Sequence, residues 1–108
     1  MGERFREYRE HLRLRRSFAV NLHKAGVPLT YEGTTENVSQ GGAFIRTKDW
    51  ESFQENDQTL LTFYLPPKFT GQDSVMRLLG TGLITRVDKE NGGLGVRFNK
   101  MLRQFERG

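Results

Sequence analysis

Short stretches in which apolar and polar residues alternate, separated by turn-forming residues, run through most of this 108-residue chain. The clearest one covers residues 17–24 and places its apolar side chains at Phe18, Val20 and Leu22. Successive side chains of a β-strand point to opposite faces, so a period of two predicts a strand with one buried face. Because each stretch is short and is followed by a turn, the pattern favours a small antiparallel β fold.

The other strands follow from the same pattern. After a turn at residues 25–26, the apolar residues Val27, Leu29 and Tyr31 predict a second strand, which Gly33 bends or bulges. Later strands are expected at residues 43–47, 59–65, 74–88 and 94–98. The segment 74–88 is either one long strand kinked at Gly80 or two strands, and 48–58 is a polar connection with room for a helical turn. We therefore predict an all-β fold, a small antiparallel barrel of about six strands.

Both ends of the chain depart from this pattern. The apolar residues Phe98, Met101, Leu102 and Phe105 recur at helical spacing, which predicts a short C-terminal helix capping the barrel. Residues 1–16 have only weak helical periodicity and no capping residue, so we expect a flexible, arginine-rich N-terminal arm. The predicted domain organisation is thus an arm at 1–16 and a barrel domain at 17–108.

Positive charge is concentrated in the arm. The formal net charge is +4, and residues 1–16 supply six arginines against three glutamates, which leaves only +1 for the rest of the chain. The planar guanidinium group makes paired contacts with phosphate and with the O6/N7 edge of guanine. A local patch of this kind predicts an anionic partner.

A polar corner precedes the third predicted strand. It contains Asn37 and Ser39, which favour turns, followed by Gly41 and Gly42, which let the backbone approach a partner closely. Such a corner suits an oxygen-rich ligand, for example a phosphate or the edge of a nucleobase. Each of these residues taken alone could equally form an ordinary turn.

The arginines and the corner together resemble a known family signature. Arg9-x-x-x-Arg13, followed after an intervening strand pair by Asn37-x-Ser39-x-x-Gly42, resembles the signature of the PilZ family of cyclic di-GMP receptors. The resemblance implies a β-barrel in which Arg9 and Arg13 clamp phosphate and guanine, with Asn37, Ser39 and Gly42 completing the binding site. By contrast, Arg15 and Arg16 are expected to be peripheral.

Position 37 affects how guanine would be read. The family pattern accepts Asp or Asn there, and this chain has Asn37. An amide offers one acceptor oxygen where a carboxylate offers two, so we expect guanine recognition that is weaker or shared with a backbone carbonyl. Ser39 suits a phosphate or holds the turn, and a Cβ atom at Gly42 would obstruct the ligand or the turn.

Catalytic and metal-binding motifs are not evident. The chain has no cysteine and only two histidines, His11 and His23, without clustered carboxylates, so we predict no metal site and no catalytic residue. No apolar run reaches the ~20 residues that a membrane span needs, and no secretory signal is apparent. We expect a binding module and not an enzyme, located in the bacterial cytoplasm and not inserted in a membrane.

The leading hypothesis is a cyclic di-GMP receptor whose arm becomes ordered on ligand binding and which then signals to a downstream protein partner. One alternative is a barrel that binds single-stranded nucleic acid. That mode needs aromatic residues interleaved with cations on one face, and the aromatic residues fit core alternation instead, so no DNA or RNA partner is expected. Another alternative is a ligand-free, PilZ-like domain of pilus or motility assembly, although such members usually lack the arginine pair.

Overall fold

The computed structural model describes residues 17–71, 73–99 and 103–107. Its elements, in chain order, are β1 (Ala19–Lys24), β2 (Thr30–Val38), β3 (Gly42–Arg46), the 3-10 turn η1 (Trp50–Ser52), β4 (Gln58–Leu65), the helix α2 (Pro67–Thr70), β5 (Met76–Asp88), β6 (Gly93–Phe98) and β7 (Arg103–Arg107). The predicted arm at residues 1–16, with Arg9 and Arg13, lies outside the described residues. The turn η1 falls in the connection where a helical turn was expected.

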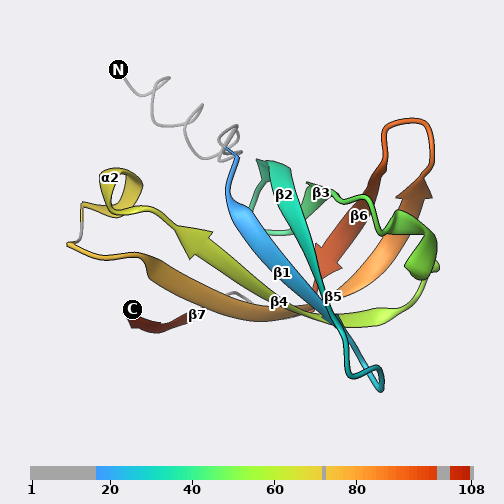
Figure 1. Ribbon diagram of the computed structural model, residues 1–108, viewed down its shortest axis with the longest axis horizontal. Coiled ribbons are helices and arrows are strands. Elements are labelled where there is room, and N and C mark those ends of the chain that lie inside the picture. Colours follow the sequence, from blue (N-terminus) through green and yellow to red (C-terminus); the bar gives the residue numbers. More distant parts are fainter. Residues whose placement is uncertain (1–16, 72, 100–102, 108) are drawn as a thin grey trace, which may run out of the picture.

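Six strands close into an antiparallel barrel. The hydrogen-bonded order is β4-β1-β2-β3-β6-β5, and the barrel closes because β4 also pairs with β5 (Figure 1). The long strand β5 extends beyond the barrel with β4, and there β7 pairs with its residues 76–79. The predicted all-β, six-stranded antiparallel barrel is therefore confirmed, with β7 as an additional strand on the outside.

The core consists of the inward-facing residues of the alternating segments. Among its members are Val20 and Leu22 from β1, Leu61 and Phe63 from β4, and Leu94 from β6, none of which is more than 2% exposed. Their burial confirms the alternation predicted from the sequence in these three strands. Removing such apolar side chains from water is the main favourable term in folding a domain of this size.

The second strand begins later than predicted. Residues 25–29 form a turn and a loop, with Gly26 at φ 80°, and Leu29 is 55% exposed. Pro28 has no amide hydrogen to donate to a strand ladder, which explains why β2 starts only at Thr30. The predicted bulge lies not at Gly33 but at Glu36, because Thr35 pairs with Ile45 whereas Asn37 already pairs with Phe44.

The predicted C-terminal helix is wrong. Residues 103–107 form the strand β7, which pairs antiparallel with β5, and Phe98 ends β6. An unpaired strand edge on β5 beyond the end of β6 offers backbone hydrogen bonds to any chain nearby, and this outweighs a helical spacing of four apolar residues. Phe98 instead packs its ring against Phe63, with the centroids 6.0 Å apart.

Within the segment 74–88, residues 76–88 form the single strand β5, with a bulge between Ile84 and Arg86. The short helix α2 was not predicted. It begins with Pro67 and ends at Thr70, and it is followed by Gly71, whose φ of 78° lies in the left-handed region that favours glycine. In the part of the chain that the structure describes, no helix is long and apolar enough to cross a membrane.

Candidate ligand-binding site

The corner between β2 and β3 is held by Ser39. Its backbone amide donates to the carbonyl oxygen of Gly42 at 2.9 Å, and its hydroxyl lies 3.4 Å from the same oxygen. The amide of Gly41 in turn donates to the Ser39 hydroxyl at 3.3 Å. The two hydroxyl bonds are long, so they hold the turn without committing the hydroxyl strongly.

Gly42 is constrained by the neighbouring strand. It pairs with Arg97 on β6, and a Cβ atom built on Gly42 would overlap the carbonyl oxygen of Val96. No such obstacle exists at Gly41, where the position of a Cβ atom is open space. The structure thus explains the glycine at position 42 by the close approach of β6. The sequence had suggested instead that a Cβ atom there would obstruct the ligand or the turn.

Three of the predicted site residues share one pocket. Asn37, Ser39 and Gly42 line an open pocket of about 310 Å³ together with Phe44 from β3, Arg86 from β5 and Gly95 from β6. The bulge at Glu36 sets the register in which Asn37 lies opposite Phe44. Structure therefore brings the predicted corner residues together, while Arg9 and Arg13 lie outside the described residues.

Arg86 and Phe44 were not predicted as site residues. The Arg86 guanidinium lies over the Phe44 ring, 5.6 Å from its centroid, and exposed cation–π contacts of this kind stabilise by about 0.5–1 kcal/mol. Gly95 sits between them in the sheet, opposite Phe44 on β3 and opposite Arg86 on β5. The sequence contains one signal for these two residues, the glycines Gly93 and Gly95 on either side of Leu94. A strand that has glycine at its outward positions leaves room for the side chains of the neighbouring strands.

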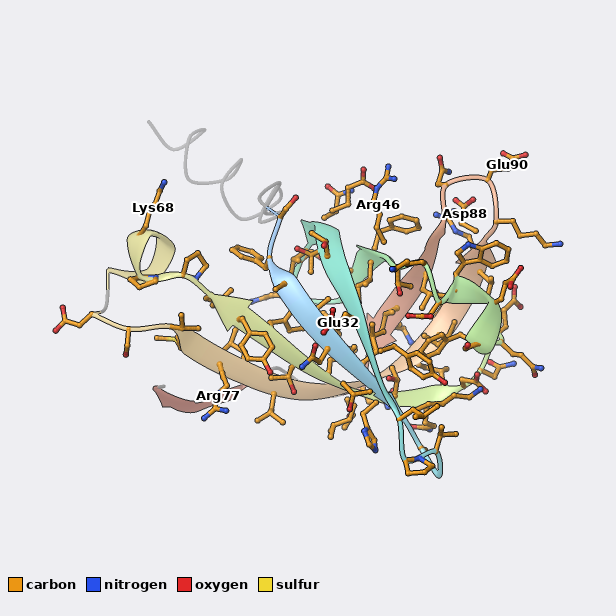
Figure 2. All side chains as sticks on the ribbon, viewed as in Figure 1. Glu32, Arg46, Lys68, Arg77, Asp88 and Glu90 are labelled. Atoms are coloured by element: carbon orange, nitrogen blue, oxygen red, sulfur yellow. The ribbon has the colours of Figure 1, made fainter. Side chains whose placement is uncertain are left out.

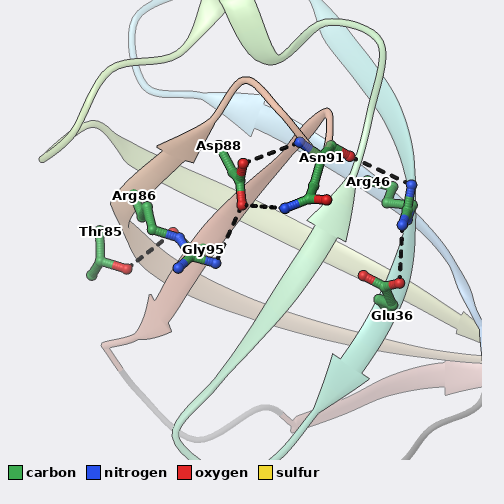
Figure 3. Close-up of polar contacts among 7 residues, drawn as sticks. All are labelled: Glu36, Arg46, Thr85, Arg86, Asp88, Asn91 and Gly95. Atoms are coloured by element: carbon green, nitrogen blue, oxygen red, sulfur yellow. Dashed lines mark hydrogen bonds and ion pairs between the residues drawn. The ribbon is translucent and has the colours of Figure 1, made fainter.

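A chain of polar contacts runs from Arg86 to the corner (Figure 3). Arg86 pairs with the Asp88 carboxylate at 3.6 Å, and Asp88 accepts two hydrogen bonds from Asn91, at 3.1 Å from its backbone amide and 2.8 Å from its side chain. Arg46 donates to the Asn91 carbonyl oxygen at 3.4 Å and pairs with Glu36 at 3.1 Å. Five residues of β2, β3, β5 and the β5–β6 turn are thereby connected on the outside of the barrel.

The electrostatics of this chain are centred on Asp88. The hydrogen bonds from Asn91, with a smaller contribution from the charge of Arg86, hold the pKa of the Asp88 carboxyl below its ordinary value of 3.8. Figure 2 shows Asp88 and Glu90 where β5 turns into β6, with Lys68 toward the opposite end of the molecule. Asp88 is therefore ionised at neutral pH and provides a fixed negative charge beside Arg86.

A larger hollow lies elsewhere on the barrel. It measures about 730 Å³ and is lined by residues that include Asn21, Thr34, Arg46, Lys48 and Trp50. Asn37, Ser39 and Gly42, the predicted ligand-binding residues that the structure describes, do not line it. We therefore do not choose the candidate site by volume, because the predicted residues Asn37, Ser39 and Gly42 line the smaller pocket.

The closed antiparallel barrel, with a pocket at the corner between β2 and β3, defines a small β-barrel domain. The sequence matches the family model described as PilZ domain over residues 7–107, and the chain belongs to the PilZ family. PilZ domains are in general cyclic di-GMP receptors, regulatory modules and not enzymes. No curated protein matches the sequence significantly.

Two solved structures share the fold. The PilZ domain of CeSA from a cellulose-synthesizing bacterium is 19% identical, with a TM-score of 0.63 over 82% of this chain and 80% of that one. The Bacillus subtilis inhibitor of motility MotI/DgrA is 16% identical, with a TM-score of 0.65 over 83% of this chain and 42% of that one. At these identities the likeness concerns the fold alone.

Proposed function

We propose that this domain is a cyclic di-GMP receptor and not an enzyme, and that it acts in the cytoplasm of a bacterium. The ligand binds between the Asn37 corner and the arginines of the N-terminal segment. The observation that carries the proposal is that Asn37, Ser39 and Gly42 line a single pocket together with residues of β5 and β6, in a chain that belongs to the PilZ family. The pocket volume of about 310 Å³ is at the lower end of the range for small-molecule sites.

Each site residue has a task that its chemistry suits. The Asn37 amide, which can both donate and accept, faces a guanine edge. Ser39 keeps the corner in shape, and its weakly held hydroxyl can turn toward a phosphate. Arg9 and Arg13 supply the positive charge that a doubly anionic dinucleotide requires, by charge-assisted contacts to phosphate and guanine.

Ligand binding also orders the arginine segment across the barrel. A dinucleotide held at the corner neutralises Arg9 and Arg13, whose like charges otherwise repel one another. Fixing each backbone residue costs about 1–2 kcal/mol, so only a few residues lock in place. The new surface formed by this segment is what a downstream protein partner reads, as in other disorder-to-order switches.

Calorimetric titration with cyclic di-GMP, GTP and a short single-stranded oligonucleotide tests the proposal. We expect binding of the cyclic dinucleotide and none of comparable strength for GTP or the oligonucleotide. Binding of the oligonucleotide alone would favour the nucleic-acid alternative. No binding of any of the three would contradict the receptor assignment and favour a ligand-free interaction domain.

A further inference from the structure

Four residues from four strands form one row across the outside of the barrel. Asn37 on β2 lies opposite Phe44 on β3, Phe44 lies opposite Gly95 on β6, and Gly95 lies opposite Arg86 on β5. Residues directly opposite one another in a sheet point to the same face. The rows on either side contain the core residues Ile45 with Leu94 and Ile84 with Val96, so this row faces outward.

Glycine on β6 allows the row to lie flat. A Cβ atom on Gly93 would be 2.5 Å from the tip of the Phe44 ring, so the ring lies directly over that backbone. A Cβ atom on Gly95 would be 3.4 Å from the Arg86 Cβ. Because these two positions have no side chains, the Phe44 ring and the stem of Arg86 both extend over β6 and meet there.

Asp88 restrains the guanidinium from the side. Its carboxylate pairs with Arg86 at 3.6 Å and is itself fixed by Asn91 (Figure 3). The Arg86 side chain nevertheless remains 61% exposed. A guanidinium with an aromatic ring on one side, a carboxylate at its edge and solvent on the rest is a restrained planar surface that is open to a ligand.

We infer that Arg86, supported by Phe44, is the platform on which a purine base of the bound dinucleotide stacks, and that it determines specificity at a position outside the recognised signature. The inference rests on the proposed function. Arginine planes and aromatic rings are the usual stacking partners of unpaired bases. Asn37 lies at the other end of the same row. In this arrangement Asn37 contacts the edge of a base and Arg86 contacts the face of a base.

Stacking can be separated from simple charge attraction by two substitutions. Arg86→Lys keeps the positive charge but loses the planar group, whereas Arg86→Ala loses both. Lys89→Ala is the matched control, since it removes one positive charge from an exposed residue of the adjacent turn that does not line the pocket. Each variant is titrated with cyclic di-GMP, and thermal unfolding verifies that it folds.

The inference predicts that Arg86→Lys and Arg86→Ala both weaken binding, by on the order of tenfold or more, the range that loss of one stacked base gives. Lys89→Ala is expected to bind as the parent does. Full rescue by lysine would overturn the inference in favour of a phosphate contact, and parent-like binding by Arg86→Ala would overturn it while leaving the receptor function intact. A parent protein that binds no cyclic di-GMP would overturn both.

Discussion

Asn37 and Arg86 occupy the two ends of one cross-strand row, separated by Phe44 and Gly95. With neighbouring strands about 4.8 Å apart, their backbones are roughly 14 Å from each other, and the long arginine side chain reaches back over Phe44. Both residues line the pocket at the β2–β3 corner. The site is thus defined by sheet register, which a bulge in β2 and another in β5 adjust.

Asn37 is expected to contribute to guanine recognition. Asn37→Ala removes the amide, so affinity for cyclic di-GMP in a calorimetric titration should fall about five- to a hundredfold, the loss of roughly 1–3 kcal/mol. Asn37→Asp supplies a second acceptor oxygen and should keep or improve affinity. If the alanine variant binds as tightly as the parent, Asn37 is only a turn residue.

Replacing Gly42 by alanine should destabilise the domain, whereas replacing the adjacent Gly41 should not. Gly42→Ala forces a methyl group against the Val96 carbonyl oxygen, and we expect a loss of about 1–3 kcal/mol in the free energy of unfolding. Gly41→Ala places its methyl group in open space and should change stability little. Urea unfolding followed by the fluorescence of Trp50 measures both. Equal stability of the two variants would contradict the packing role of Gly42.

Asp88 should contribute to stability only where it is ionised. Its pKa in the folded protein lies below the ordinary value of 3.8, so its contribution is complete above that value and is lost as the pH falls through the lower, folded pKa. Thermal unfolding of the parent and of Asp88→Asn between about pH 7 and about pH 2 should show a difference that is constant at high pH and shrinks below 3.8. A difference independent of pH would mean that the charge of Asp88 is not involved.

Hydrogen exchange tests the proposed ordering. Adding cyclic di-GMP should increase protection chiefly in residues 6–16 and 36–43, with the barrel strands little changed, because the proposed ligand contacts fall mainly on the arginine segment and the corner. The matched control is GTP at the same concentration. Protection of the first segment that is already complete without ligand, or a gain confined to β7, would contradict the switch even if binding were observed.

Local pattern was sufficient for the barrel but not for all of the site. The alternation around Val20, Leu61 and Leu94 identifies buried strand faces because a half-buried strand requires it. The shared pocket of Asn37 and Ser39 was likewise predictable, since the two residues lie two positions apart where β2 ends at the corner. Arg86 could not be assigned in this way, because it reaches the pocket only through the pairing of β3 with β6, two strands that are distant in the sequence.

The C-terminal error has the same origin. Phe98 and Phe105 fit a helical spacing, yet residues 103–107 pair with the free edge of β5, a partner that no local pattern reveals. The late start of β2 could have been predicted from the sequence, because Pro28 cannot donate a ladder hydrogen bond and so argues against a strand through that position.

The most direct measurement of the central claim is a calorimetric titration of cyclic di-GMP into the parent, Arg9→Ala, Arg13→Ala and a control, Lys68→Ala, which changes an exposed residue of α2 that does not line the pocket. We predict that the parent and Lys68→Ala bind alike, whereas each arginine variant binds about five- to a hundredfold more weakly, since each loses a contact of roughly 1–3 kcal/mol. Thermal unfolding should be the same for all four proteins. A parent that does not bind the dinucleotide, or arginine variants that bind it as tightly as the parent, would contradict the assignment of this domain as a receptor that uses Arg9 and Arg13.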